Sequence, residues 1–230
     1  MLGLPDGVTA CLFDLDGVLT KTATVHARAW KQMFDDYLRE RGDERPFDEH
    51  DDYDTYVDGK PRAAGVRDFL ASRGLHPPDD EIARLGNIKN DLVLDLIKTE
   101  GVEAYPGSVR YLQAVSDAGL RRAVVSSSHN CKDVLEAAGI GDLFEQRVDG
   151  VVADELQLQG KPHPDTFLEG ARRLGVAATE AAVYEDALAG VAAGRAGGFG
   201  RVVGVNRVGQ REALLQHGAD IVVEDLEELL

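Results

Sequence analysis

The sequence predicts an α/β protein with a parallel sheet, helices on both faces of the sheet, and a helical insertion near the N-terminus. Two observations lead to this fold class. Short apolar, β-branched runs alternate with helical stretches through the C-terminal half of the chain, as is typical of parallel sheets. Between the first two apolar runs, a long stretch carries helical patterning and no clear strand.

The first predicted strand runs from Val8 to Phe13 and ends on two carboxylates. Asp14 and Asp16 flank one leucine, and Gly17 then lets the chain turn sharply. We expect both side chains at the strand tip, where one can attack or bind metal while the other transfers a proton. A solvated Asp-Gly turn would explain Asp16 and Gly17, but not Asp14 at the end of an apolar strand.

The insertion extends from Thr22 to about Gly101. Residues 26–38 form one amphipathic segment, and residues 81–98 carry apolar side chains at helical spacing. We expect a helical cap over the sheet edge where open α/β folds bind their ligands. The acidic run at residues 47–54 is interpreted as a solvated connector between cap helices, because no fixed ligand neighbours its carboxylates.

Strands and helices alternate through the rest of the chain. Predicted strands cover residues 121–126, 181–184, 201–205 and 221–223, and predicted helices cover residues 108–118, 132–138, 164–174, 187–196 and 210–217. Four glycines just past helices are expected to be left-handed caps, namely Gly119, Gly139, Gly175 and Gly218. The core is expected to comprise residues 1–20 and 104–230, and the cap residues 21–103.

Composition narrows the classes of partner. The 230 residues are 43% hydrophobic and carry a formal net charge of −16. Such a surface repels nucleic acids and anionic membranes, so neither is an expected partner, and a phosphate site requires a local cluster of cations and N–H groups. Cys11 and Cys131 are interpreted as core residues rather than a disulfide. The sequence contains neither a signal peptide nor a membrane-spanning stretch, which predicts a cytoplasmic protein.

Two loops offer groups for phosphate. Ser126–Asn130 presents hydroxyl, amide and backbone donors, although serine-rich loops also simply cap helices. Lys161 lies in a segment stiffened by Pro162 and Pro164, which makes it a candidate fixed cation for a phosphoryl group. Taken alone, a surface lysine in a turn explains the second motif equally well.

A second carboxylate pair, Glu185 and Asp186, ends the apolar run at residues 181–184. Together with Asp14 it would complete an oxygen-ligand site for Mg²⁺. Asp186 could instead be the N-cap of the helix predicted to begin at Ala187. The convergence of all four motifs on one edge of one sheet favours the catalytic interpretation.

With these motifs in this order, nearly the whole chain resembles the haloacid-dehalogenase-like superfamily of aspartate-nucleophile phosphotransferases. Asp14 and Asp16 match its first motif, Ser126 the second, Lys161 the third, and Glu185-Asp186 the fourth. The resemblance implies a Rossmann-like core with a small helical cap.

The insertion is similar to the cap of the β-phosphoglucomutase family. The similarity rests on Thr22, the stretch His26–Trp30, the loop Val57–Arg62, the pair Lys89-Asn90 and the return at residues 105–107. It implies that a sugar phosphate contacts Thr22, His26, Trp30, Gly59, Lys60, Arg62, Lys89, Ser127, Ser128, His129 and Asn130. The chain departs from the family at His129, where a lysine is frequent, and at Ala187, where serine is common.

The resemblance also implies a mechanism. Asp14 is the nucleophile that forms an aspartyl phosphate, Asp16 transfers protons, and Lys161 and Ser126 hold phosphoryl oxygens. Mg²⁺ is bound by Asp14, the backbone carbonyl of Asp16, Glu185 and Asp186.

The function implied is conversion of β-glucose 1-phosphate to glucose 6-phosphate by a monomer, with glucose 1,6-bisphosphate as intermediate and activator. A phosphatase acting on hexose phosphates or other small metabolites is the alternative, because it would use the same core. A sugar-phosphate sensor without activity fits poorly, since every core catalytic position holds a competent residue.

Overall fold

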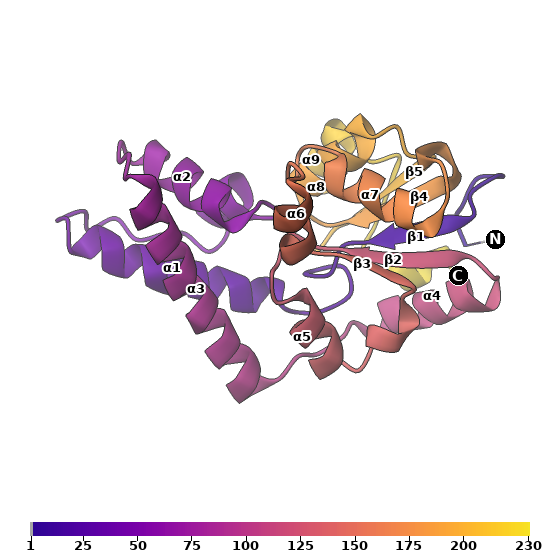
Figure 1. Cartoon of the computed structure of the whole chain (residues 1–230), viewed down its shortest axis with the longest axis horizontal. Helices are drawn as coiled ribbons and strands as arrows, with labels where there is room; N and C mark the ends of the chain where they lie inside the picture. The colour runs from indigo at the N-terminus through magenta and orange to yellow at the C-terminus, as the bar shows by residue number, and fades with distance from the viewer. Residues whose placement is uncertain (1) are drawn as a thin grey trace.

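The computed structural model describes residues 2–230 and has the predicted α/β fold with a helical insertion (Figure 1). Six strands form one sheet in the order β3-β2-β1-β4-β5-β6, and every neighbouring pair is parallel. The carboxyl ends of the strands therefore meet at one edge. The strands are β1 (Ala10–Phe13), β2 (Arg121–Val125), β3 (Gln146–Val148), β4 (Ala181–Glu185), β5 (Arg201–Val205) and β6 (Ile221–Val223).

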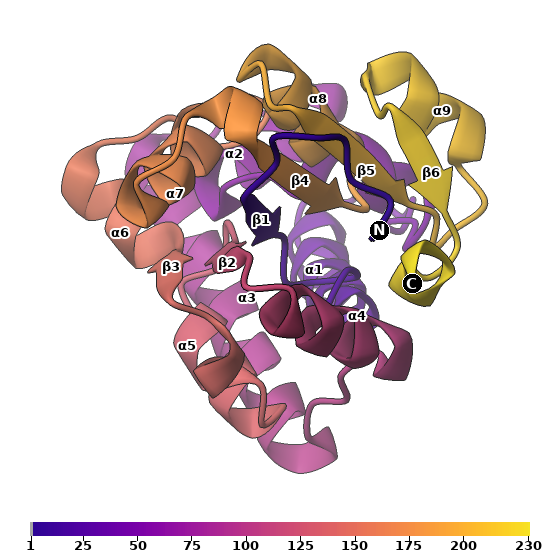
Figure 2. The same ribbon diagram turned by 90° about the vertical axis from the view of Figure 1, so that its right-hand side faces the viewer.

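Helices cover both faces of the sheet, and this explains why the central strands are continuous apolar runs (Figure 2). Phe13 of β1 faces the layer formed by α4 (Pro106–Asp117) and α5 (Cys131–Ala137). Leu12 faces the opposite layer. The helices of that layer are α7 (Asp165–Leu174), α8 (Leu188–Ala196) and α9 (Arg211–His217).

All five predicted strands and all five predicted helices of the core are present, with small shifts at their ends. The four predicted cap glycines have positive φ, as expected. Sequence reasoning missed β3 and the helix that follows it, α6 (Gly150–Leu156). β3 is a three-residue edge strand of which only Val148 is buried, so no apolar run announces it.

The insertion is helical, as predicted. Its helices are α1 (Ala23–Arg39), the π-helical turn η1 (Tyr53–Val57), α2 (Arg62–Ser72) and α3 (Asp79–Glu100). They enclose an apolar cluster of their own, in which Phe34 packs against Trp30, Phe47 and Phe69. None of the helices within residues 2–230 combines the length and the apolar character needed to cross a bilayer.

Two adjacent linkers join the insertion to the core. Lys21 N–H donates to the carbonyl of Glu103 at 2.8 Å, and Tyr105 N–H donates to that of Leu19 at 2.9 Å. Thr20 and Ala104 form an antiparallel bridge between the same two segments. Residues 19–21 and 103–105 thus pair at the two ends of the insertion.

The cap lies closed on the core. Ser127 Oγ, at the tip of β2, donates to the carbonyl of Gly59 in the cap at 2.8 Å. Pro61 lies so close to Gly160 that a Cβ added to this glycine would be 2.0 Å from the proline Cγ. Closure therefore depends on the absence of a side chain at position 160.

We predict that Gly160→Ala holds the cap open, because the added methyl group and the ring of Pro61 cannot occupy the same space. Trp30 is the single tryptophan and is only 3% exposed, so opening should increase quenching of its fluorescence by acrylamide. The double variant Gly160→Ala/Pro61→Ala should restore the wild-type quenching. Equal quenching of the wild type and Gly160→Ala would contradict this account of closure.

Candidate active site

Three neighbouring strand tips bring the predicted motifs together. Asp14 follows β1, Ser126 follows β2, Glu185 is the last residue of β4, and Asp186 follows it. Asp14 N–H continues the sheet by donating to the carbonyl of Tyr184 at 2.9 Å. The expectation that these motifs converge on one edge of the sheet is confirmed.

A buried lysine lies among the carboxylates. Lys161 Nζ is 2.5 Å from Asp14 Oδ1, 2.7 Å from Glu185 Oε1 and 3.1 Å from the carbonyl oxygen of Val125. Burial alone would lower the pKa of Lys161, but Asp14 and Glu185 together hold it above its ordinary value. Lys161 is therefore a permanent cation at the sheet edge, and not a lysine in a surface turn.

The carboxylates outnumber this cation. Asp14, Glu185 and Asp186 each offer an oxygen atom, and the three atoms lie within 4.8 Å of one another. Burial raises the pKa of Asp14 and of Asp186 well above the ordinary range, against the opposing effect of Lys161 on Asp14. Since these are three oxygen donors with one ammonium, their chemistry fits a hard divalent cation.

Gly17 allows this cluster to form. Its φ is +86°, and a Cβ on it would be 1.7 Å from Asp186 Oδ2. The carboxylate of Asp186 thus packs directly against the backbone of the loop that carries Asp14 and Asp16.

Asp16 has different partners from Asp14. Thr22 Oγ1 donates a hydrogen bond to Asp16 Oδ1, and His26 Nε2 lies 3.4 Å from the same oxygen. Both partners belong to the start of the insertion. The side chain of Asp16 therefore faces the cap, outside the cluster of Asp14, Glu185 and Asp186.

His26 and Lys89 form a buried pair behind Asp16. Lys89 Nζ is 2.7 Å from His26 Nδ1 and 4.8 Å from the ring centre of Trp30. Burial and the Lys89 cation lower the pKa of His26 to about 4, so the ring is neutral at pH 7. Nδ1 then accepts from Lys89, which assigns the ring proton to Nε2, facing Asp16. Burial and the charge of Arg62 lower the pKa of Lys89 to about 7.

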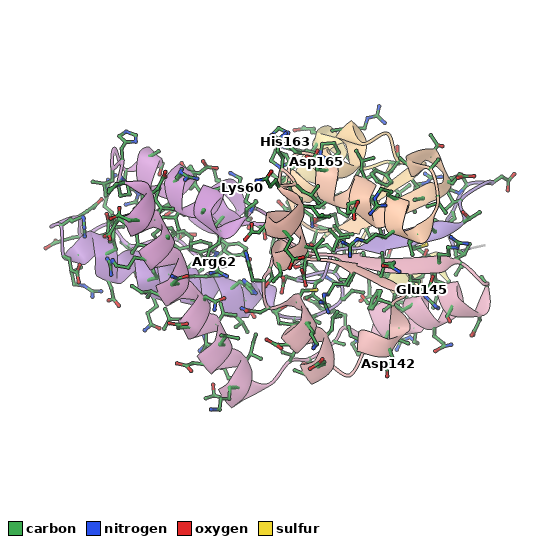
Figure 3. All side chains as sticks on the ribbon, in the orientation of Figure 1. Lys60, Arg62, Asp142, Glu145, His163 and Asp165 are labelled. Atoms are coloured by element: carbon green, nitrogen blue, oxygen red, sulfur yellow. The ribbon has the colours of Figure 1, made fainter. Side chains whose placement is uncertain are left out.

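A cavity between the strand tips and the cap collects most of the predicted site residues. Its predicted lining residues are Asp14, Asp16, His26, Trp30, Gly59, Lys60, Arg62, Lys89, Ser127, Ser128, Asn130 and Asp186. Figure 3 marks Lys60 and Arg62 on the part of the cap that faces the core. Four further predicted residues do not line the cavity but contact residues around it: Thr22, Ser126, Lys161 and Glu185.

His129 does not line the cavity. Its Nε2 lies 2.8 Å from Asp154 Oδ2 on α6, and its ring packs so closely on Gly150 that a Cβ there would be 2.6 Å from Nδ1. The structure thus places His129 beside α6, away from the position at which a ligand contact was predicted.

Sequence reasoning missed Tyr53, Val57, Asp58, Asn90 and Ala187 as lining residues. Tyr53 belongs to the run interpreted as a solvated connector, and nothing in that run marks it. Asp58 lies in the cap loop that was singled out for its cations. Burial, and next the charge of Glu185, raise the pKa of Asp58 to about 8.

We predict that Lys89→Met changes stability in a pH-dependent way. The folded-state pKa of Lys89 is about 7 and its ordinary value is 10.5, so the buried ammonium costs folding free energy fully below about pH 7, and the cost shrinks as pH rises. The melting temperature of Lys89→Met minus that of the wild type, measured by calorimetry in phosphate-free buffer, should be largest near pH 6 and should fall toward pH 10.

The control for this prediction is Lys60→Met, which removes another lysine of the cavity that is ion-paired with Asp68 at 2.7 Å. A difference between Lys89→Met and wild type that is constant over this pH range would contradict the assignment of a depressed pKa to Lys89.

Comparison with known proteins agrees with this geometry. The sequence profile of the haloacid dehalogenase-like hydrolases matches residues 8–198. The chain is 53% identical to the β-phosphoglucomutase of Mycobacterium tuberculosis, over all of this chain and 94% of that protein. It is 30% identical to hexitol phosphatase A of Escherichia coli, over 95% and 91% of the two chains. The crystal structure of β-phosphoglucomutase from Clostridium difficile superposes with a TM-score of 0.79 at 27% identity, covering 97% of this chain and 93% of that one. The chain therefore belongs to the haloacid dehalogenase-like hydrolase family.

Proposed function

We propose that the protein is a Mg²⁺-dependent β-phosphoglucomutase that works through an aspartyl phosphate. It would interconvert β-glucose 1-phosphate and glucose 6-phosphate, with glucose 1,6-bisphosphate as intermediate and activator. One observation carries the proposal: the cavity has the reactive carboxylates Asp14 and Asp16 on the core side and the cations Arg62 and Lys89 on the cap side. The 53% identity to a β-phosphoglucomutase supports the same substrate.

Asp14 is the nucleophile in this proposal. One of its oxygens attacks phosphorus while the bond between phosphorus and the sugar oxygen breaks, which leaves the phosphoryl group on Asp14. Lys161, 2.5 Å from Asp14 Oδ1, stabilises the ionised carboxylate that this attack requires. Mg²⁺ held by Asp14, Glu185, Asp186 and the backbone carbonyl of Asp16 would neutralise charge on the phosphoryl oxygens.

Asp16 is the general acid and base. It gives a proton to the departing sugar oxygen and takes one from the hydroxyl that accepts the phosphoryl group in the second half-reaction. The hydrogen bond from Thr22 and the nearby Nε2–H of His26 hold its carboxylate in place. Because both partners come from the cap side, closure of the cap positions the proton-transfer group.

The cap cations are suited to the distal phosphate. Arg62 Nη2 donates to the amide oxygen of Asn90 at 2.9 Å, and Asn130 Nδ2 donates to the same atom at 2.9 Å. Within residues 2–230, neither Arg62 nor Lys89 is paired with a carboxylate. Both cations can therefore bind an anion without first breaking an ion pair.

A phosphatase is the second candidate, because hexitol phosphatase A is 30% identical to this chain. The core residues serve both reactions, since water can replace the sugar hydroxyl in the second step. The closed cap favours the mutase, which must keep its phosphoryl group from water while the bisphosphate turns over.

The test is incubation with β-glucose 1-phosphate, Mg²⁺ and a trace of glucose 1,6-bisphosphate, with glucose 6-phosphate and free phosphate assayed together. We expect glucose 6-phosphate to dominate, and EDTA to abolish its formation. Asp14→Asn is the control, because its amide cannot attack phosphorus and should give neither product. Release of free phosphate without isomerisation would replace the mutase by the phosphatase.

Arg62→Ala should separate the two reactions further. An intermediate with phosphates at both ends must be held at its far end whichever way it binds, whereas a small ester such as acetyl phosphate has no far end. We expect isomerisation to fall by about 10²-fold, as for loss of a charge-assisted contact of ~1.5–3 kcal/mol, with a smaller effect on acetyl phosphate hydrolysis. Lys60→Met is the comparison, because Lys60 is already paired with Asp68. Equal losses of both activities in Arg62→Ala would argue against a distal phosphate site.

A further inference from the structure

We propose that Arg207 and Gln210, in the loop after β5, are positioning residues that fix the two walls of the cation site and so set its affinity for Mg²⁺. The inference deepens the proposed function and rests on its metal site. Neither residue lines the cavity of the reactive carboxylates. They lie on the other side of Asp186, in a neighbouring cavity that Asp186 also borders.

Arg207 holds the loop that carries Asp14 and Asp16. Its Nε donates to the carbonyl oxygen of Gly17 at 2.7 Å, and Nη2 lies 3.4 Å from that of Val18. The guanidinium is itself fixed, since Nη1 donates to the carbonyl oxygen of Glu224 at 2.9 Å and the group lies 3.6 Å from the ring centre of Tyr105. The catalytic loop is thus tied to the C-terminal end of the core through one side chain.

The direction of the Asp16 carbonyl depends on the hydrogen bonds made on both sides of Gly17. Gly17 N–H donates to the carbonyl of Thr20 at 2.8 Å. In a planar trans peptide the carbonyl of Asp16 points opposite to this N–H. Gly17 has φ +86° and no side chain to restrain it, so hydrogen bonds on both sides of it are needed to hold this orientation.

Gln210 holds the opposite wall. Its Nε2 donates to the backbone carbonyl of Asp186 at 3.1 Å, and its own N–H donates to Asn206 Oδ1 at 2.7 Å. The carboxylate of Asp186 packs against Gly17, which Arg207 holds. The loop after β5 therefore forms hydrogen bonds with both segments that supply the cation ligands, the loop after β1 and the end of β4.

For Mg²⁺ affinity, a positioning role of Arg207 and its simple electrostatic effect predict changes in opposite directions when the residue is replaced. Arg207 is a cation beside a cation site, so removal of its charge alone would strengthen Mg²⁺ binding. Loss of its hydrogen bonds would instead let the Asp16 carbonyl and Asp186 move apart and weaken binding. Partners that orient metal ligands typically change affinity by ~10–100-fold when removed.

The experiment measures Mg²⁺ binding by calorimetry on the full-length protein after treatment with EDTA. We expect Arg207→Met, Arg207→Lys and Gln210→Met each to weaken binding by ~10-fold or more. Arg207→Lys retains the positive charge but cannot reach the carbonyls of both Gly17 and Val18. It therefore separates the effect of the hydrogen bonds from the effect of the charge. The control is Arg211→Met, which removes an arginine bonded to Val222 and Glu224 and should bind Mg²⁺ like wild type.

Thermal unfolding in EDTA shows whether each variant is folded, and the rise in melting temperature on adding Mg²⁺ should shrink with the affinity. If Arg207→Met does not fold, Arg207→Lys and Gln210→Met still decide the question. Unchanged or tighter binding in the folded variants would overturn the positioning role and leave the proposed function intact. A wild type that binds no Mg²⁺ would instead overturn the proposed metal site and this inference with it.

Discussion

The buried ammonium of Lys161 is the interaction on which the rest of the site depends. It joins three strand tips, because its partners are Asp14 after β1, the carbonyl of Val125 at the end of β2, and Glu185 at the end of β4. Charges so deeply buried are tolerated only when they are paired. The same pairing that keeps the strand ends together also opposes the rise that burial causes in the pKa of Asp14, so the stability of this edge and the charge state of Asp14 have one origin.

The fold could be predicted wherever burial leaves a pattern. The central strands are covered on both faces, so their sequences are unbroken apolar runs, and the helices that cover them end on glycines. β3 and α6 have no such pattern. Only Val148 of β3 is buried, and Gly150 is the only buried residue of α6. β3 is instead defined by its hydrogen bonds with β2, and α6 by the N-capping side chain of Asp149. Strand pairing and helix capping of this kind depend on the tertiary structure around them.

The site could be predicted where a residue contradicts its surroundings, as Asp14 does at the end of an apolar strand. Tyr53 could not be found in this way, because an aromatic residue in a polar connector is equally suited to packing. His129 illustrates the opposite limit, since its place in a serine-rich loop indicates a phosphate contact while Asp154 draws it toward α6. The direction of a side chain depends on neighbours that are distant in sequence, and a motif does not contain them.

The contacts that close the cap have a kinetic consequence. Ser127 binds Gly59, and Asn130 binds Asn90, through groups of the protein alone. A ligand must therefore wait for these bonds to break before it can enter the cavity. Its association rate is then the encounter rate multiplied by the fraction of time that the cap is open. In the closed state the same contacts also oppose the release of a bound molecule. An enzyme with such a cap binds its ligand more slowly, but keeps the bound molecule for longer.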